Sequence, residues 1–193
     1  MIDTIKNNLL HYQPKYLGSD LPQAGVLIAV TNEIEPKVIL TRRAKTLSSH
    51  GGEVAFPGGK RDESDADIIF TALREAHEEI DLKPSQVDII GRMDESLSLH
   101  RLQVTPCVGV ISPDAKLQAN LDELDCIFKV PLSFFLDDNN RCDHIEAYRS
   151  KARFAPCFLF DDFLIWGLTS YMLMDFLNVS LNADIALKPR PNY

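Results

Sequence analysis

Three glutamates gather within five positions of one segment, in which Arg74 and Glu75 are followed by Glu78 and Glu79. At helical spacing Glu75 shares a face with both Glu78 and Glu79, and each like-charged pair costs a helix roughly 0.2–0.5 kcal/mol. At about 100° per residue, Glu79 falls within the apolar arc of the segment and Glu75 at its edge. Buried carboxylates need a cation or hydrogen-bond donors. Because Mg²⁺ and Mn²⁺ prefer carboxylate oxygens and recruit substrate phosphates, the segment predicts a metal site.

A glycine pair precedes this segment. Gly58 and Gly59 follow Phe56 and Pro57, and glycine lets the backbone approach a ligand closely and present a carbonyl to a metal. The alternative interpretation is a tight turn after Pro57 followed by an acidic amphipathic helix, whose glutamates are solvated or paired with Arg74. The turn and the ligand-binding role of the glycines are compatible with each other.

The elements that must position these groups are indicated by hydrophobic periodicity. Apolar residues repeat at helical spacing between 67 and 82, and residues 43–65 form a long glycine-containing connection, typical of a functional loop. Runs rich in β-branched residues predict strands, and Pro106 places one of them at an edge or a bulge. We expect strands at 25–31, 37–42, 87–93 and 103–111, a strand and a short helix within 120–136, a hairpin at 143–161 and a closing helix at 166–177.

The composition bounds the class of protein. The 193 residues favour a single domain, placed at 24–180, with an N-terminal helix and linker at 1–23 and a tail at 181–193. Lys and Arg total 20 against 28 Asp and Glu, and the resulting charge of −8 argues against nucleic-acid and anionic-membrane partners. The four cysteines lack zinc-site spacing, and we expect all four to be reduced thiols in a cytoplasmic protein without an export signal.

The segment GGKRDESDADIIFTALREAHEEIDL, residues 58–82, resembles the Nudix box of the Nudix hydrolases, which cleave a nucleoside diphosphate linked to another moiety. Two features depart from the usual box: the spacing from Gly59 to Arg74 is one residue longer, and Asp81 stands where the box has glycine. Both departures are familiar in one branch, the coenzyme A pyrophosphatases. The resemblance implies an α/β Nudix fold, in which a mixed β-sheet is sandwiched between helices (α/β/α).

A second signature of that branch lies upstream. It appears here as L-T-R-R-A at 40–44, then Gly52 and F-P-G-G at 56–59, with Ser48 where the signature has arginine. Further similarity lies in V-T-P-C-V-G at 104–109. The resemblance therefore extends well beyond the box, and Ser48 leaves the substrate less certain than the reaction.

The resemblance also implies roles for individual residues. Glu75 and Glu79 would be the principal metal ligands, Glu78 an additional ligand or acid, and the Gly59 carbonyl a backbone ligand, while Arg74 would orient a glutamate through a salt bridge. Glu123 would complete the metal cluster or deprotonate water. The implied catalytic residues are thus Glu78, Glu79 and Glu123. A doubly charged phosphate chain also needs donors, and the cations near the glycine loop, Arg42, Arg43 and Lys60 beside Arg61, are the candidate substrate-binding residues, with Arg43 at the signature arginine. His50, in the signature loop, is a further candidate.

The implied activity is hydrolysis of the pyrophosphate of coenzyme A or its derivatives, with Mg²⁺ or Mn²⁺, to 3′,5′-ADP and 4′-phosphopantetheine. One alternative is a Nudix hydrolase of another nucleoside diphosphate derivative, such as ADP-ribose or NADH. The alternative of another class is a non-catalytic, nucleotide-sensing Nudix module. The expected partner is a small-molecule substrate rather than a nucleic acid or a membrane, and a homodimer is left open.

Overall fold

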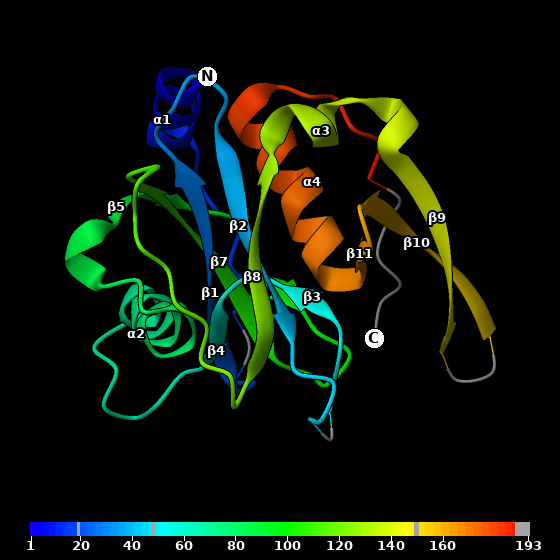
Figure 1. Cartoon of the computed structure of the whole chain (residues 1–193), viewed down its shortest axis with the longest axis horizontal. Coiled ribbons are helices and arrows are strands. Elements are labelled where there is room, and N and C mark those ends of the chain that lie inside the picture. The colour runs from blue at the N-terminus through cyan, green and yellow to red at the C-terminus, as the bar shows by residue number, and fades with distance from the viewer. Residues whose placement is uncertain (19, 48, 149–150, 188–193) are drawn as a thin grey trace.

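The computed structural model describes residues 1–18, 20–47, 49–148 and 151–187, with the side chains of 143–155 outside the description. The chain forms a mixed β-sheet flanked by helices, which confirms the expected α/β architecture, and its last three strands form a separate antiparallel sheet (Figure 1). The helices are α1 (Ile2–His11), α2 (Ile68–Ile80), α3 (Leu132–Leu136) and α4 (Gly167–Leu181), and the strands are β1 (Gln23–Thr31), β2 (Lys37–Arg43), β3 (Val54–Ala55), β4 (Gly58–Lys60), β5 (Asp88–Arg92), β6 (Ser96–Leu97), β7 (Gln103–Ile111), β8 (Leu124–Pro131), β9 (Arg141–Tyr148), β10 (Lys151–Phe160) and β11 (Phe163–Trp166).

The main sheet has the order β3-β2-β1-β7-β5, with β8 paired to β2 and β6 to β7. Strands β1 and β7 run parallel, whereas their other neighbours are antiparallel. β1 meets β2 at Val30 and Val38, and near its start it pairs instead with β4, where Gly25 lies opposite Gly59. The long connection predicted at 43–65 therefore contains two short strands, and one of them places the glycine pair beside β1.

Alternating side chains of the sheet build two separate cores. On one face, Leu27 and Ile39 pack against α2. On the other face, Ile28 and Leu40 pack with α1 and α4, and α1 contributes Ile5 to this second core. Because successive residues of a strand point to opposite faces, neighbouring residues of one strand belong to different layers. No helix among the described residues is long and apolar enough to span a membrane.

Helix α2 has well-defined ends, and its predicted range of 67–82 is confirmed to within two residues. Asp67 caps the first turn, because its carboxylate accepts a hydrogen bond of 2.8 Å from the backbone N–H of Phe70. The helix ends at Asp81, which has a left-handed backbone with φ of 53°. Glycine is the usual residue for this conformation, and aspartate is one of the few others that tolerate it. The aspartate found in place of the box glycine is thus compatible with the helix end.

Two expectations about strands and cysteines need correction. The prediction that all four cysteines are reduced was wrong for Cys142 and Cys157, which form a disulfide between β9 and β10, whereas Cys107 and Cys126 are free. The two bonded cysteines lie directly opposite each other in the antiparallel register, a proximity that sequence spacing does not reveal. The expected edge position of Pro106 was wrong, because β7 is an interior strand. Both β5 and β6 pair with the same side of β7, and Pro106 lies opposite the connection between them. The missing N–H of proline is tolerated there because neither strand pairs with it.

Candidate active site

The most buried of the three helix glutamates is Glu79, on the face of α2 that packs against β1 and β4. Glu79 is 4% exposed, and its Oε2 accepts a hydrogen bond of 3.1 Å from the backbone N–H of Gly58. Gly58 has a φ of 156°, and a Cβ added there would lie 2.5 Å from the carbonyl oxygen of Gly25. Only glycine can bring its N–H this close, so the first glycine of the pair is required by packing.

The environment of Glu79 disfavours its charge. Burial raises the pKa of Glu79 to about 7, and the negative charges of Glu75 and Glu123 add to this effect. The hydrogen bond from Gly58 and the charge of Arg43, whose Nη1 lies 4.0 Å from Glu79 Oε1, act in the opposite direction without cancelling it. The carboxylate is therefore buried with too few positive or donating groups around it.

Glu75 lies one turn earlier on the same helix, against the second glycine. A Cβ added to Gly59 would come within 2.5 Å of the Glu75 carboxylate, so any larger residue would fill the space beside it. Burial is the main cause that raises the pKa of Glu75, although Arg74 opposes the shift. Glu75 and Glu79 are thus brought together as predicted, with the glycine backbone on one side of them.

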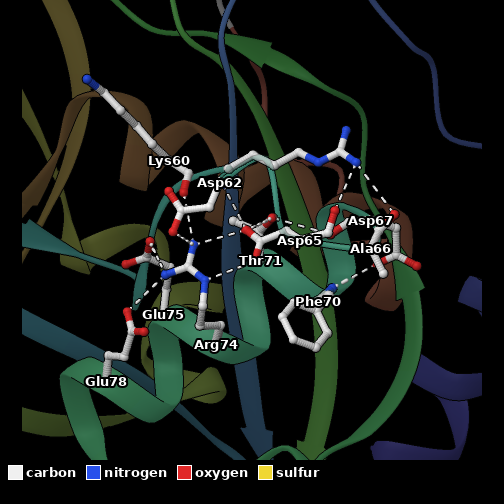
Figure 2. Close-up of polar contacts among 11 residues, drawn as sticks. Lys60, Asp62, Asp65, Ala66, Asp67, Phe70, Thr71, Arg74, Glu75 and Glu78 are labelled. Carbon is white, nitrogen blue, oxygen red and sulfur yellow. Dashed lines mark hydrogen bonds and ion pairs between the residues drawn. The ribbon is translucent and has the colours of Figure 1, made fainter.

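Arg74 uses all five of its N–H donors (Figure 2). Its Nε and Nη2 each donate to Asp65 at 3.0 Å, and Nη2 also donates to the Lys60 carbonyl at 3.1 Å. Its Nη1 lies 2.9 Å from a carboxylate oxygen of Glu75 and 2.9 Å from one of Glu78. Arg74 therefore contacts two of the predicted metal ligands, in agreement with the salt-bridge role expected for it.

Asp65 is the acid of this region that the sequence reasoning missed. It is 3% exposed, and besides Arg74 it accepts hydrogen bonds from the Thr71 hydroxyl at 2.8 Å and the Asp62 N–H at 3.0 Å. The hydrogen bonds from Arg74 are the main cause that holds the pKa of Asp65 far below its usual range. Its position in the loop before the helix was the available signal, but the sequence offers several other acids there and does not show which one is buried.

Glu123 reaches the site from the loop before β8. Its Oε1 accepts a hydrogen bond of 3.2 Å from the side chain of Asn120, whose backbone N–H donates to the Glu79 carbonyl at 2.9 Å. The Glu123 carbonyl accepts from the N–H of Ala44 at 2.8 Å, immediately after β2. The negative charge of Glu123 raises the pKa of both Glu75 and Glu79. The structure thus joins the three acids from two segments more than forty residues apart.

The two adjacent arginines of β2 point to opposite faces of the sheet. Arg43 faces α2, whereas Arg42 lies on the opposite face, with its guanidinium 5.1 Å from the ring centroid of Phe163. Arg42 also forms ion pairs of 3.6 Å with Asp125 and 3.4 Å with Asp162. The structure therefore brings one of the two predicted substrate-binding arginines to the glutamates and directs the other away, as expected for successive strand residues.

The remaining predicted substrate-binding residues have other partners or point away from the glutamates. His50 is exposed, and its Nδ1 lies 2.9 Å from Glu53. Lys60 is exposed, and its side chain extends away from the carboxylates (Figure 2). Arg61 donates to the side chain of Gln23 and to backbone carbonyls of its own loop, which it stabilises. Their roles toward a substrate stay a prediction.

The acidic donors fit a hard divalent cation by their chemistry. Glu75 and Glu79 are carboxylates whose raised pKa values report a shortage of positive charge, and the close approach of Gly59 leaves room that a side chain would occupy. In the part of the chain that the structure describes, no three Asp, Glu, His or Cys side chains are already arranged to enclose a metal, and Arg74 occupies an oxygen of Glu75 and of Glu78. The metal-ligand roles therefore stay a prediction.

The glycine pair beside a helix that carries the buried Glu79 and the half-buried Glu75 forms an acidic site whose chemistry suits a hard divalent cation. The NUDIX domain family matches residues 21–125. A protein named uncharacterized Nudix hydrolase NudL from Cronobacter sakazakii (strain ATCC BAA-894) is 38% identical over 161 residues, 79% of this chain and 80% of that protein. Its namesake from Escherichia coli O1:K1 / APEC is 36% identical over 168 residues, 86% of this chain and 84% of that protein.

The chain belongs to the Nudix family and is a pyrophosphohydrolase. This assignment does not favour the non-catalytic alternative. Members of the family generally depend on a divalent metal and act on nucleoside diphosphate derivatives. The expected Nudix fold, a mixed sheet with flanking helices, is confirmed.

Solved structures are also similar to the chain. A Nudix hydrolase from M. smegmatis, RenU, has a TM-score of 0.49 and 23% identity, covering 57% of this chain and 71% of that one. The NUDIX domain of Shewanella oneidensis NrtR, solved with ADP ribose, has a TM-score of 0.49 and 20% identity, covering 67% of this chain and 84% of that one.

Proposed function

We propose that the protein hydrolyses the pyrophosphate bond of coenzyme A or one of its derivatives, giving 3′,5′-ADP and 4′-phosphopantetheine, with Mg²⁺ or Mn²⁺ as cofactor. The observation that carries the proposal is the position of Arg43, which occupies the arginine of the coenzyme A pyrophosphatase signature and lies 4.0 Å from Glu79. The signature is thereby joined to the glutamates of the helix. Ser48, where the signature has a second arginine, lies outside the described residues.

The chain supplies two groups for this chemistry, Glu123 and Arg43, and Glu75 and Glu79 would hold the divalent cation. When bound there, the cation would neutralise phosphate charge and make water more acidic. Glu123 accepts the proton of the attacking water, and its Oε2 serves this role because Oε1 accepts a hydrogen bond from Asn120. Water forms a new bond to one phosphorus, and the bridging P–O bond breaks and leaves the second phosphate. Arg43 supplies positive charge to the phosphate chain from the β2 side, opposite the helix.

The second candidate is hydrolysis of another nucleoside diphosphate derivative, which the departure at Ser48 favours. Both candidates predict the same reaction on different leaving groups, so the test is a substrate comparison. Coenzyme A, ADP-ribose and NADH are incubated with the purified protein and Mg²⁺ or Mn²⁺, and the products are resolved by chromatography. The proposal expects 3′,5′-ADP and 4′-phosphopantetheine at the highest kcat/KM. A higher kcat/KM for ADP-ribose or NADH would replace coenzyme A as the substrate.

A further inference from the structure

Two exposed histidines from separate loops contact each other. His50 belongs to the loop between β2 and β3, and His100 to the loop between β6 and β7. Their ring centroids lie 5.0 Å apart with the rings nearly perpendicular, at 85°. The two loops are fifty residues apart in the sequence, so the contact is created by the fold. Neither the metal-binding glutamates nor the pyrophosphate chemistry accounts for it.

This histidine pair is connected to the catalytic residues through the backbone. The N–H of Arg43 donates to the Glu53 carbonyl at 3.0 Å, and the N–H of Gly52 donates to the Arg43 carbonyl at 3.0 Å. The Glu53 carboxylate in turn lies 2.9 Å from Nδ1 of His50. These backbone bonds hold the His50 loop against the end of β2, the strand whose Arg43 side chain lies 4.0 Å from Glu79.

Besides the acid Glu53, the two loops that carry the pair contain cations. His100 is exposed, and its ring contacts that of His50. Arg101 follows it and is exposed, and the Lys45 side chain passes Gly52 in the same loop as His50. In a chain with a net charge of −8, such a local group attracts an anion only at short range, because the protein as a whole repels it.

The backbone at both loops is held in an unusual conformation. His50 has a φ of 57° and Arg101 a φ of 59°, in the left-handed region that residues with a side chain seldom adopt. Such conformations persist where the surrounding structure enforces them, and they cluster at binding and catalytic sites. Here they occur on both sides of the ring contact, which indicates that the two loops are shaped to present these side chains.

We propose that His50 and His100, together with Arg101, bind a phosphate monoester of the substrate at a distance from the pyrophosphate that is cleaved. The inference rests on the proposed function, for which that group is the 3′-phosphate of coenzyme A. Imidazole and guanidinium N–H groups are suited to phosphate oxygens, and Glu53 fixes the ring of His50 so that Nε2 points away from it. The pair therefore determines specificity without taking part in bond cleavage.

The kinetic test compares coenzyme A with 3′-dephospho-coenzyme A, which differs only in this phosphate. For His100→Ala we expect about a tenfold loss of kcat/KM on coenzyme A, carried by KM, and less than a twofold change on the dephospho substrate, since one charge-assisted hydrogen bond is worth roughly this factor. His11→Ala, an exposed histidine on α1, is the matched control and should change neither value. Equal losses on both substrates, or none, would overturn the subsite.

A binding measurement separates this inference from the proposed function. The histidine ring resonances are followed by NMR while 3′,5′-ADP or 5′-AMP is added. We expect 3′,5′-ADP to shift the His50 and His100 signals and 5′-AMP to shift them far less, whichever substrate is hydrolysed. If coenzyme A is not cleaved but the shifts occur, the proposed function fails and the subsite stands. If coenzyme A is cleaved and the two nucleotides give equal shifts, the subsite fails alone.

Discussion

Two equally buried carboxylates, one in the loop before α2 and one on α2 itself, have pKa values that are shifted in opposite directions. Asp65 is 3% exposed and Glu79 is 4% exposed. Arg74 and its other donors hold the pKa of Asp65 far below the usual range, whereas burial raises that of Glu79 to about 7. Asp65 accepts four hydrogen bonds, two of them from a guanidinium. Glu79 accepts one from a backbone N–H and lies 4.0 Å from Arg43.

The difference shows that burial alone does not decide the charge of a carboxylate. The number and charge of the donors decide it, because each donor offsets part of the lost hydration. The negative charge of Asp65 is compensated by donors within the protein, and its role is structural. The negative charge of Glu79 is not fully compensated, and a cation from solution is the group that would compensate it. The following predictions separate the two regions by stability and by activity.

The largest effect is expected for Glu79→Gln. Losing a charged ligand removes several kcal/mol of charge stabilisation, so Mg²⁺-dependent hydrolysis should fall by roughly 10³-fold. This loss is measured as steady-state turnover of the best substrate from the substrate comparison, and circular dichroism checks that the protein is folded. Glu63→Gln, an exposed acid of the preceding loop, should leave turnover unchanged. Activity like that of the wild type in Glu79→Gln would reject the metal-site assignment.

Asp65→Asn should mainly affect stability. The change leaves the guanidinium of Arg74 without its bidentate partner, and removing one member of a buried pair costs about 3 kcal/mol or more. Urea denaturation measures the loss in the free energy of unfolding. Asp62→Asn is the matched control, because Asp62 is exposed and lies 3.8 Å from Arg74, and it should change stability by less than about 0.5 kcal/mol. An equal effect of the two substitutions would contradict the structural role of Asp65.

Glu123→Gln should lower kcat by about 10²-fold and change KM little, because a proton acceptor acts in the transition state. Asp122→Asn removes the exposed neighbouring acid and should have no effect on either constant. Steady-state kinetics over a range of substrate concentrations separates the two parameters. A loss confined to KM would reject the role of Glu123 in proton transfer.

The smallest effect concerns the pH dependence of stability without metal. Because its pKa is raised in the folded state, Glu79 contributes stability below its unfolded pKa of about 4.5, and this is lost as pH rises through about 7. In EDTA, the Tm should therefore fall by a few °C between about pH 5 and pH 8. Glu79→Gln should flatten this fall, and Mg²⁺ should reverse it in the wild type. An unchanged pH profile in Glu79→Gln would remove Glu79 as its cause.

Asp65 should control the acidic side of the same pH profile of stability. Its pKa is lowered in the folded state, so its contribution is present above the unfolded pKa of about 3.8 and is lost as pH falls below that value. Asp65→Asn should reduce the acid sensitivity of Tm relative to the wild type, with Asp62→Asn again as the control. The two carboxylates would then be separated in one experiment by the side of the profile that each controls.

Much of the site was accessible from local sequence patterns. The helical periodicity of 67–82 predicted α2 and placed Glu79 on its buried face, because both properties depend on residues within one or two turns. The glycine pair was predicted to bring the backbone close to a ligand; the structure places Gly58 and Gly59 against Glu79 and Glu75, and the role toward a metal stays a prediction. The strands were also located by their β-branched runs, although the two short strands within the long connection carried no such pattern.

The sequence by itself determined the helix, its acidic face and the resemblance to Nudix hydrolases. The tertiary structure decided which partners those acids receive. It assigned Arg43 rather than Arg42 to the glutamates, selected Asp65 as the partner of Arg74 and paired Cys142 with Cys157. These outcomes depend on strand register and on contacts between segments far apart in the chain, whereas periodicity reports only on neighbours along it.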